Sequence, residues 1–120
     1  MVVVDAHVHI GHRDTRSSYM GTAPSTFSAE DMLTIMRKNG VDRVIAMSMQ
    51  KGKGLDYAED NKLIADAMRK YPDKLSGFAR INPWHERAVQ DLETAVTKWG
   101  FRGLKFHPEA DSFHPNDDVA

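Results

Sequence analysis

The sequence contains no cysteine among its 120 residues. This absence excludes disulfide bonds and metal sites built on thiolate ligands, so any bound metal must be held by imidazole nitrogen or by oxygen. Ligands of these types are compatible with divalent zinc, manganese, iron, nickel or cobalt.

An excess of either charge is also missing. The 16 basic residues nearly balance the 17 acidic ones, and no block of like charge occurs, so nothing favours nucleic acid or an anionic membrane as a partner. The N-terminus lacks the basic segment and apolar stretch of a signal peptide, and no apolar run approaches the roughly 20 residues that a bilayer requires. We therefore expect a cytoplasmic protein that acts on a small molecule and binds neither nucleic acids nor membranes.

Apolar runs of strand length alternate with segments of helical periodicity. Strands are expected at residues 2–9, 43–49, 75–81 and 103–107, and helices at 28–39, 57–70 and 86–99. Helix-to-strand connections are short, whereas strand-to-helix connections are longer and include an expected polar loop at 10–27. This order predicts an α/β fold with a parallel sheet, either a barrel or an open doubly wound sheet.

The expected helices carry local signals of their ends and their buried faces. Ser28 with Asp31 forms a pattern typical of an N-terminal capping box, and Gly40 is a typical helix stop. Asn116 is a candidate cap for a fourth helix. The apolar faces are expected to contain Met32, Ile35 and Met36 in the first helix, Leu63, Ile64, Ala67 and Met68 in the second, and Val89, Leu92, Val96 and Trp99 in the third.

The first strand ends in a His-x-His motif formed by His7 and His9. Side chains two residues apart on a strand point to the same face, so both imidazoles can reach one metal ion at the carboxyl end of the sheet. Two such ligands, with others from later strands, would leave a coordination position open for water. The alternative interpretation is two ordinary histidines at a strand end.

Two further groups of residues have an open role. Lys105 and His107 share a face of the fourth expected strand and are candidates for contact with an anionic substrate; alternatively, Lys105 pairs with a core carboxylate and His107 is a packed or solvent-facing histidine. Asp5 has the same strand parity as the two motif histidines. It would either orient a ligand histidine or pair with a cation such as Lys105.

Three segments resemble one known family, in the same order along the chain. Val4–Gly11 resembles the first strand of the amidohydrolase superfamily, and Tyr71–Pro83 resembles the third strand of its amidohydrolase-related branch, which includes aminocarboxymuconate semialdehyde decarboxylase. Gly100–Pro108 is similar to the fourth strand of hydrolase-like members. The resemblance implies a (βα)8 barrel with one catalytic metal bound by His7 and His9. The other ligands and the acid/base groups of this family come from strands five, six and eight.

A closed barrel of this kind needs roughly 250 residues. We therefore expect residues 1–120 to form the N-terminal half of a TIM-type (βα)8 barrel that ends after strand four, with the catalytic residues in the other half. Because strands one and four would be exposed edges, a homo-oligomer could close the half-barrel.

The resemblance implies a metal-dependent hydrolase that uses a divalent metal, zinc first and manganese second, to activate water or polarise a small carboxylate or amide substrate. The alternatives are a non-oxidative decarboxylase on the same scaffold and a non-catalytic half-barrel fragment or subunit. Phosphoesterases of the polymerase-and-histidinol-phosphatase type also begin with His-x-His, but the third and fourth strand segments argue against them.

Overall fold

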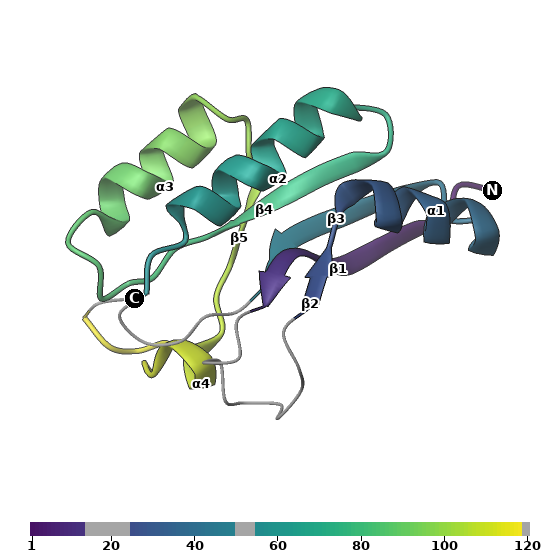
Figure 1. The fold of residues 1–120 in the computed structure, drawn as a ribbon. Helices are drawn as coiled ribbons and strands as arrows, with labels where there is room; N and C mark the ends of the chain where they lie inside the picture. Colours follow the sequence, from purple (N-terminus) through teal and green to yellow (C-terminus); the bar gives the residue numbers. More distant parts are fainter. Residues whose placement is uncertain (14–24, 50–54, 119–120) are drawn as a thin grey trace.

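The computed structural model describes residues 1–13, 25–49 and 55–118, and the structural statements below concern these residues. Strands and helices alternate over most of this length (Figure 1). In chain order the elements are β1 Val4–Arg13, β2 Ser25–Phe27, α1 Ala29–Asn39, β3 Arg43–Ser48, α2 Ala58–Lys70, β4 Leu75–Arg80, α3 Ala88–Thr97, β5 Gly103–Lys105 and α4 Pro108–Asp111.

The strands form one five-stranded sheet in the order β2-β1-β3-β4-β5. Neighbouring strands among β1, β3, β4 and β5 are parallel, and β2 runs antiparallel to β1. Parallel strands must be joined by crossover connections, which here contain α1, α2 and α3. The predicted α/β fold with a parallel sheet is thus confirmed, and in the described residues this sheet is open rather than closed into a barrel.

One face of the sheet packs against the helices and forms the hydrophobic core. Figure 1 shows α2 and α3 on the same side of the sheet. The close approach of α2 requires Gly77 on β4, because a Cβ there would lie 2.6–2.8 Å from side-chain atoms of Met68, Phe101 and Ile64. The strand residues of this core include Ile10, Val44, Ala46, Leu75 and Ala79.

The opposite face carries the alternate residues of the same strands. The register pairs His9 with Met47, and Arg80 with Lys105. Paired residues of neighbouring strands lie on the same face, so these side chains lie opposite the helix-covered core. In a closed (βα)8 barrel this face is the interior, and its carboxyl end is the mouth where sites form.

The structure corrects the loop that was expected at 10–27. β1 continues to Arg13, and β2 pairs with it in the register Gly11↔Phe27, His12↔Thr26, Arg13↔Ser25. A three-residue polar strand has too weak a pattern to be recognised in the sequence, but its pairing satisfies main-chain groups at the edge of β1. This part of β1 is therefore not the exposed edge that was expected. Residues 14–24 of this expected loop lie outside the described residues.

The expected buried faces of the helices are only partly correct. In α1 and α2 the apolar stripe holds Met32, Met36, Ile64 and Ala67, but Ile35 is 51% exposed and Leu63 is 44% exposed. For the third expected helix, Trp99 packs against the core as expected and Leu92 is half-buried, but Val89 and Val96 are 79% and 53% exposed, and the fully buried residue is the small Ala95. The reason is that each helix touches a single sheet through a narrow stripe, so neighbouring apolar positions stay in solvent.

The local end signals of α1 are confirmed. Ser28 and Asp31 form a complete capping box, and Gly40 adopts the left-handed conformation with φ of 68°. The fourth helix begins earlier than at Asn116. α4 starts at Pro108, because the ring nitrogen of His107 accepts the N–H of Ala110 and proline suits the first helical turn.

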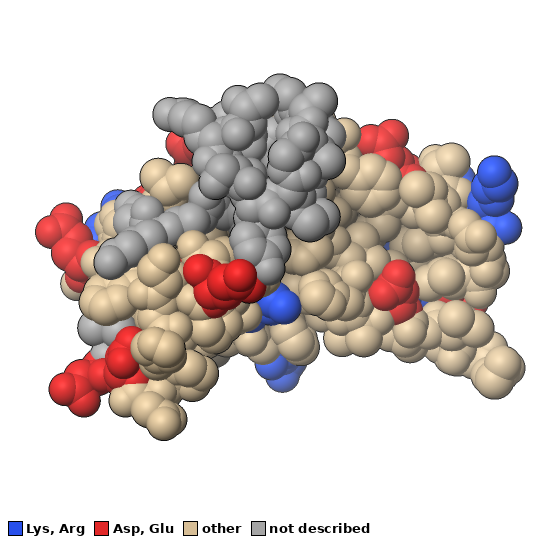
Figure 2. Space-filling model, turned by 90° about the horizontal axis from the view of Figure 1, so that it is seen from below, with Lys and Arg blue, Asp and Glu red and all other residues tan. Residues whose placement is uncertain are grey.

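No helix within the described part of the chain has both the length and the apolar character needed to cross a membrane. On the face seen from below, acidic and basic side chains lie scattered among other residues (Figure 2).

Candidate functional site

The two histidines of the His-x-His motif converge on one point at the inner face of β1. The Nε2 atoms of His7 and His9 lie 3.0 Å apart, and the ring planes are tilted by 52°. Two imidazoles bound to one tetrahedral zinc at ~2.0–2.1 Å have their nitrogens about 3.3 Å apart. The pair therefore fits two adjacent ligand positions of a single divalent metal.

His9 is oriented by the neighbouring strand. Its Nδ1 lies 2.7 Å from the main-chain oxygen of Ser48 on β3. Because a carbonyl only accepts, Nδ1 carries the proton and Nε2 presents a lone pair toward His7. Partial burial lowers the pKa of His9 below 6.5; the Ser48 contact acts in the opposite direction, and the positive charges of His7, Arg80 and Lys105 lower it further. His9 is thus held as the neutral imidazole that binds metals.

The position of His7 depends on an irregularity in β1. Asp5 pairs with Val44 and Val8 pairs with Ala46, so β1 has one extra residue between these pairs. Oδ1 of Asp5 accepts the main-chain N–H of His7 at 3.0 Å. This bulge breaks the period-two relation that would have placed Asp5 on the face of the histidines, and Asp5 accepts a main-chain rather than a ring N–H.

Two basic residues at the ends of β4 and β5 lie on the same face of the sheet as His9. Arg80 is directly paired with Lys105, and both act electrostatically on His9. Lys105 was an expected site residue, whereas the sequence pattern did not single out Arg80. The available signal was a charged residue at the end of an otherwise apolar strand, two residues after Phe78 and hence on its face.

Arg80 is fully buried and is held by an acidic residue from α4. Its Nη2 donates to Oδ2 of Asp111 at 3.2 Å, and Tyr57 donates to Oδ1 of the same carboxylate at 2.8 Å. The guanidinium also lies 4.7 Å from the centre of the Tyr57 ring. Within the described part of the chain, Nε and Nη1 of Arg80 have no hydrogen-bond partner. Together, Arg80 and Lys105 provide two positive charges beside the single carboxylate of Asp111.

The sequence suggested that Lys105 and His107 share one face of a strand, but only Lys105 lies in the strand. β5 ends at Lys105, so the strand period does not extend to His107. Nδ1 of His107 accepts the N–H of Ala110 at 3.2 Å and caps α4. Lys105 is half-buried, and no ion pair joins it to another described residue.

The histidine pair is not a complete metal centre by itself. The described residues contain no group of three or more His, Cys, Asp or Glu side chains that could hold a metal ion. Among the residues that the structure describes, the pair therefore offers two candidate metal ligands.

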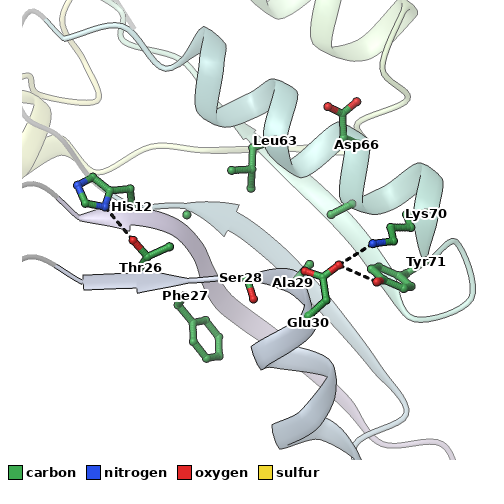
Figure 3. A pocket seen from close by; sticks show the side chains of 12 residues that line it. His12, Thr26, Phe27, Ser28, Ala29, Glu30, Leu63, Asp66, Lys70 and Tyr71 are labelled. Atoms are coloured by element: carbon green, nitrogen blue, oxygen red, sulfur yellow. Dashed lines mark hydrogen bonds and ion pairs between the residues drawn. The ribbon is translucent and has the colours of Figure 1, made fainter.

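A separate cavity of about 300 Å³ lies on the helix side, between β1, β2, α1 and α2 (Figure 3). Its lining includes Phe27 and Ala67 but neither histidine of the pair. Glu30 of α1 and Lys70 of α2 form an ion pair of 2.8 Å at its border. Since it is largely apolar and lies behind the sheet, this cavity is not part of the candidate metal site.

The fold is similar to several solved structures, although the sequence identity is low. A manganese-bound 5-carboxyvanillate decarboxylase from Novosphingobium aromaticivorans has a TM-score of 0.79 and 16% identity, with 98% of this chain and 45% of that chain covered. For 4-oxalomesaconate hydratase from Rhodopseudomonas palustris the TM-score is 0.66 and the identity 17%, with 98% and 46% covered. A 2,6-dihydroxybenzoate decarboxylase from Rhizobium has a TM-score of 0.64 and 18% identity, with 87% and 38% covered.

The chain thus spans less than half the length of these structures. No curated protein matches it in sequence. The family model described as amidohydrolase matches residues 4–120, which include both motif histidines and the ends of all four parallel strands. On this match the chain belongs to the amidohydrolase family.

Proposed function

We propose that residues 1–120 form the half of a (βα)8 barrel that supplies the strand-one part of a divalent-metal centre, and that the complete centre catalyses metal-dependent hydrolysis. His7 and His9 would hold the metal. The 3.0 Å separation of their Nε2 atoms is the observation that carries this proposal. The contact of His9 with Ser48 supports it, because it leaves Nε2 as the unprotonated nitrogen.

A metal held there would activate a water molecule or polarise the carbonyl of a small carboxylate or amide substrate. The protein residues around it would bind and orient that substrate. Lys105 and His107 are the proposed substrate contacts, and Arg80 adds a second positive charge beside Lys105. An excess of cations in a partly buried mouth favours an anionic group such as a carboxylate.

A non-oxidative decarboxylase is the second candidate. Two of the similar structures are decarboxylases of aromatic carboxylates, and one of them contains manganese. The same histidine pair and the same basic residues would serve this reaction, in which the carbon–carbon bond to a substrate carboxylate breaks, carbon dioxide leaves and a proton from an acid group takes its place on the carbon. The relatives favour manganese, whereas the all-imidazole donor pair also suits zinc.

The remaining ligands and the acid/base groups would come from the other half of a barrel. That half is either further polypeptide or a second copy of this chain that pairs to complete the sheet. A second copy would bring another histidine pair. A paired assembly would therefore hold up to two metals per eight strands, whereas a single complete barrel would hold one.

Native mass spectrometry after loading with Zn²⁺ or Mn²⁺ tests the metal site. We expect metal uptake by the wild-type chain and loss of uptake in His7→Ala/His9→Ala. The control is His85→Ala/His114→Ala, which removes two histidines remote in sequence from the motif and should bind as the wild type does. Equal metal occupancy in the wild type and the His7/His9 variant would refute the proposal. The mass of the metal-bearing species also gives the number of chains in the assembly.

A further inference from the structure

The two histidines of the proposed metal site are positioned by different parts of the molecule. The ring of His9 is fixed by the carbonyl of Ser48. Among the described residues, the hydrogen bond and the ring contact of the His7 side chain are both with His9. The direction of the His7 ring therefore depends on how its own main chain is held.

The main chain at His7 lies within the β1 bulge. Between the Asp5–Val44 and Val8–Ala46 pairs, β1 advances by three residues and β3 by two. A bulge removes a residue from the regular ladder, bends the strand and changes the direction of its side chains. The N–H of His7 is bonded instead to Oδ1 of Asp5, at 3.0 Å and two residues away.

This bulge bears directly on the separation of the two ring nitrogens. Residues two apart on a regular strand are about 6.6 Å apart along the chain axis. The Nε2 atoms of His7 and His9 nevertheless approach to 3.0 Å, with the rings tilted by 52° rather than stacked in parallel. Bulges generally increase the local twist of a strand, which would let the His7 ring lean toward that of His9.

We propose that Asp5 is a positioning residue of the metal centre, which acts by accepting the main-chain N–H of His7 and so fixing the bulge that aims the His7 ring at His9. The proposal rests on the proposed function, because it assumes that the pair binds a metal. The role of Asp5 is that of a hydrogen-bond acceptor, so an uncharged acceptor of the same shape should replace it.

The chain offers a matched control for this interaction. Asp42 is also an acidic residue whose carboxylate accepts a main-chain N–H of the N-terminal segment, that of Val3, at 2.8 Å. The control variant Asp42→Ala removes a comparable carboxylate-to-main-chain hydrogen bond from the same region, but it does not touch the bulge. Asp5→Asn retains an acceptor oxygen, and Asp5→Ala removes it.

The test is calorimetric titration of the full 120-residue chain and its variants with Zn²⁺. We expect about tenfold weaker binding for Asp5→Ala, within the range found when a group that orients a metal ligand is lost. Asp5→Asn and Asp42→Ala should remain within about twofold of the wild type. Unchanged affinity in Asp5→Ala, or equal weakening in Asp5→Asn, would overturn the proposal.

Amide hydrogen exchange, measured without metal, provides a second readout. The His7 amide should exchange more slowly in the wild type and in Asp5→Asn than in Asp5→Ala. If Asp5→Ala does not fold, fast exchange of this amide in the wild type or in Asp5→Asn is the result that overturns the proposal. The two hypotheses fail differently: a wild-type chain that takes up no metal refutes the metal site, whereas normal uptake with no dependence on Asp5 refutes only the positioning role.

Discussion

The side chain of Asn61 bonds to both main-chain polar groups of Arg80. Nδ2 of Asn61 donates to the carbonyl oxygen of Arg80 at 2.6 Å, and Oδ1 accepts its N–H at 2.9 Å. Both residues are buried. A helix residue thus takes the place of a neighbouring strand at the end of β4, and it holds the segment that carries Arg80 beside the histidine pair.

We expect Asn61→Ala to lower the free energy of unfolding by about 2–4 kcal/mol, because two buried main-chain groups lose their partners. Asn61→Asp should also be costly, because its carboxylate can accept the Arg80 N–H but sets a buried, charged acceptor against the Arg80 carbonyl oxygen. Urea denaturation measures both effects. The control is Asn39→Ala, at an exposed residue whose Nδ2 donates to Ile35, and it should change stability by less than about 0.5 kcal/mol. A similar small change for Asn61→Ala would contradict this account.

The ion pair between Arg80 and Asp111 is almost completely buried, with side-chain exposures of 0% and 1%. Asp111→Asn leaves the guanidinium without a counter-charge, and we expect a loss of about 3–5 kcal/mol in unfolding free energy. The exposed pair of Arg87 with Asp56 is the control, and Arg87→Gln should cost less than about 1 kcal/mol. Thermal or urea unfolding measures both losses. Similar losses for the two variants would show that burial does not set the contribution of the Arg80–Asp111 pair to stability.

Glu30 links α1 to α2 at the border of the cavity between β1, β2 and these two helices. Hydrogen bonds from Lys70, and then from Tyr71, lower the pKa of Glu30 from 4.5 to about 2. Because the folded-state pKa is lowered, the contribution to stability is present above pH 4.5 and is lost as the pH falls toward 2. Carboxyl carbon NMR titration should show the low pKa in the wild type and a pKa closer to 4.5 in Lys70→Met. A titration of Glu30 that does not respond to Lys70→Met would contradict the assignment.

His9 should be neutral near pH 7 with its proton on Nδ1. This tautomer follows from the contact of 2.7 Å with the Ser48 carbonyl, and burial keeps the pKa of His9 below 6.5. The unfolded chain then binds the proton more readily, so acidification through pH 6.5 disfavours the folded state at this residue. Ring nitrogen-15 shifts report the tautomer directly. Ser48→Ala keeps the carbonyl and should not change them, whereas a proton on Nε2 in the wild type would be inconsistent with the geometry.

The regular features of the fold were predictable because they depend on local sequence. The alternation of strands and helices follows from hydrophobic periodicity, and the bounds of β3 and β4 differ from expectation by one residue at one end. The capping box of Ser28 and the stop at Gly40 need only the residues around the helix ends. The spacing of His7 and His9 likewise pointed to one shared space, and their assignment as metal ligands stays a prediction.

The features that could not be predicted depend on residues distant in the sequence. Asp111 meets Arg80 and Tyr57, which precede it by 31 and 54 residues, only after the strands are paired. The exposure of Val89 and Val96 depends on which stripe of α3 the sheet covers, and periodicity alone does not choose among adjacent stripes.

The sequence by itself therefore determined the order of the four parallel strands and the three crossover helices, the capping of α1 and the residue types available for a metal, since these are properties of short segments. The tertiary structure decided the bulge at His7, the pairing of β2 and the cluster around Arg80. Those depend on the register between strands and on which buried polar groups find partners, and both are settled only when the whole sheet is assembled.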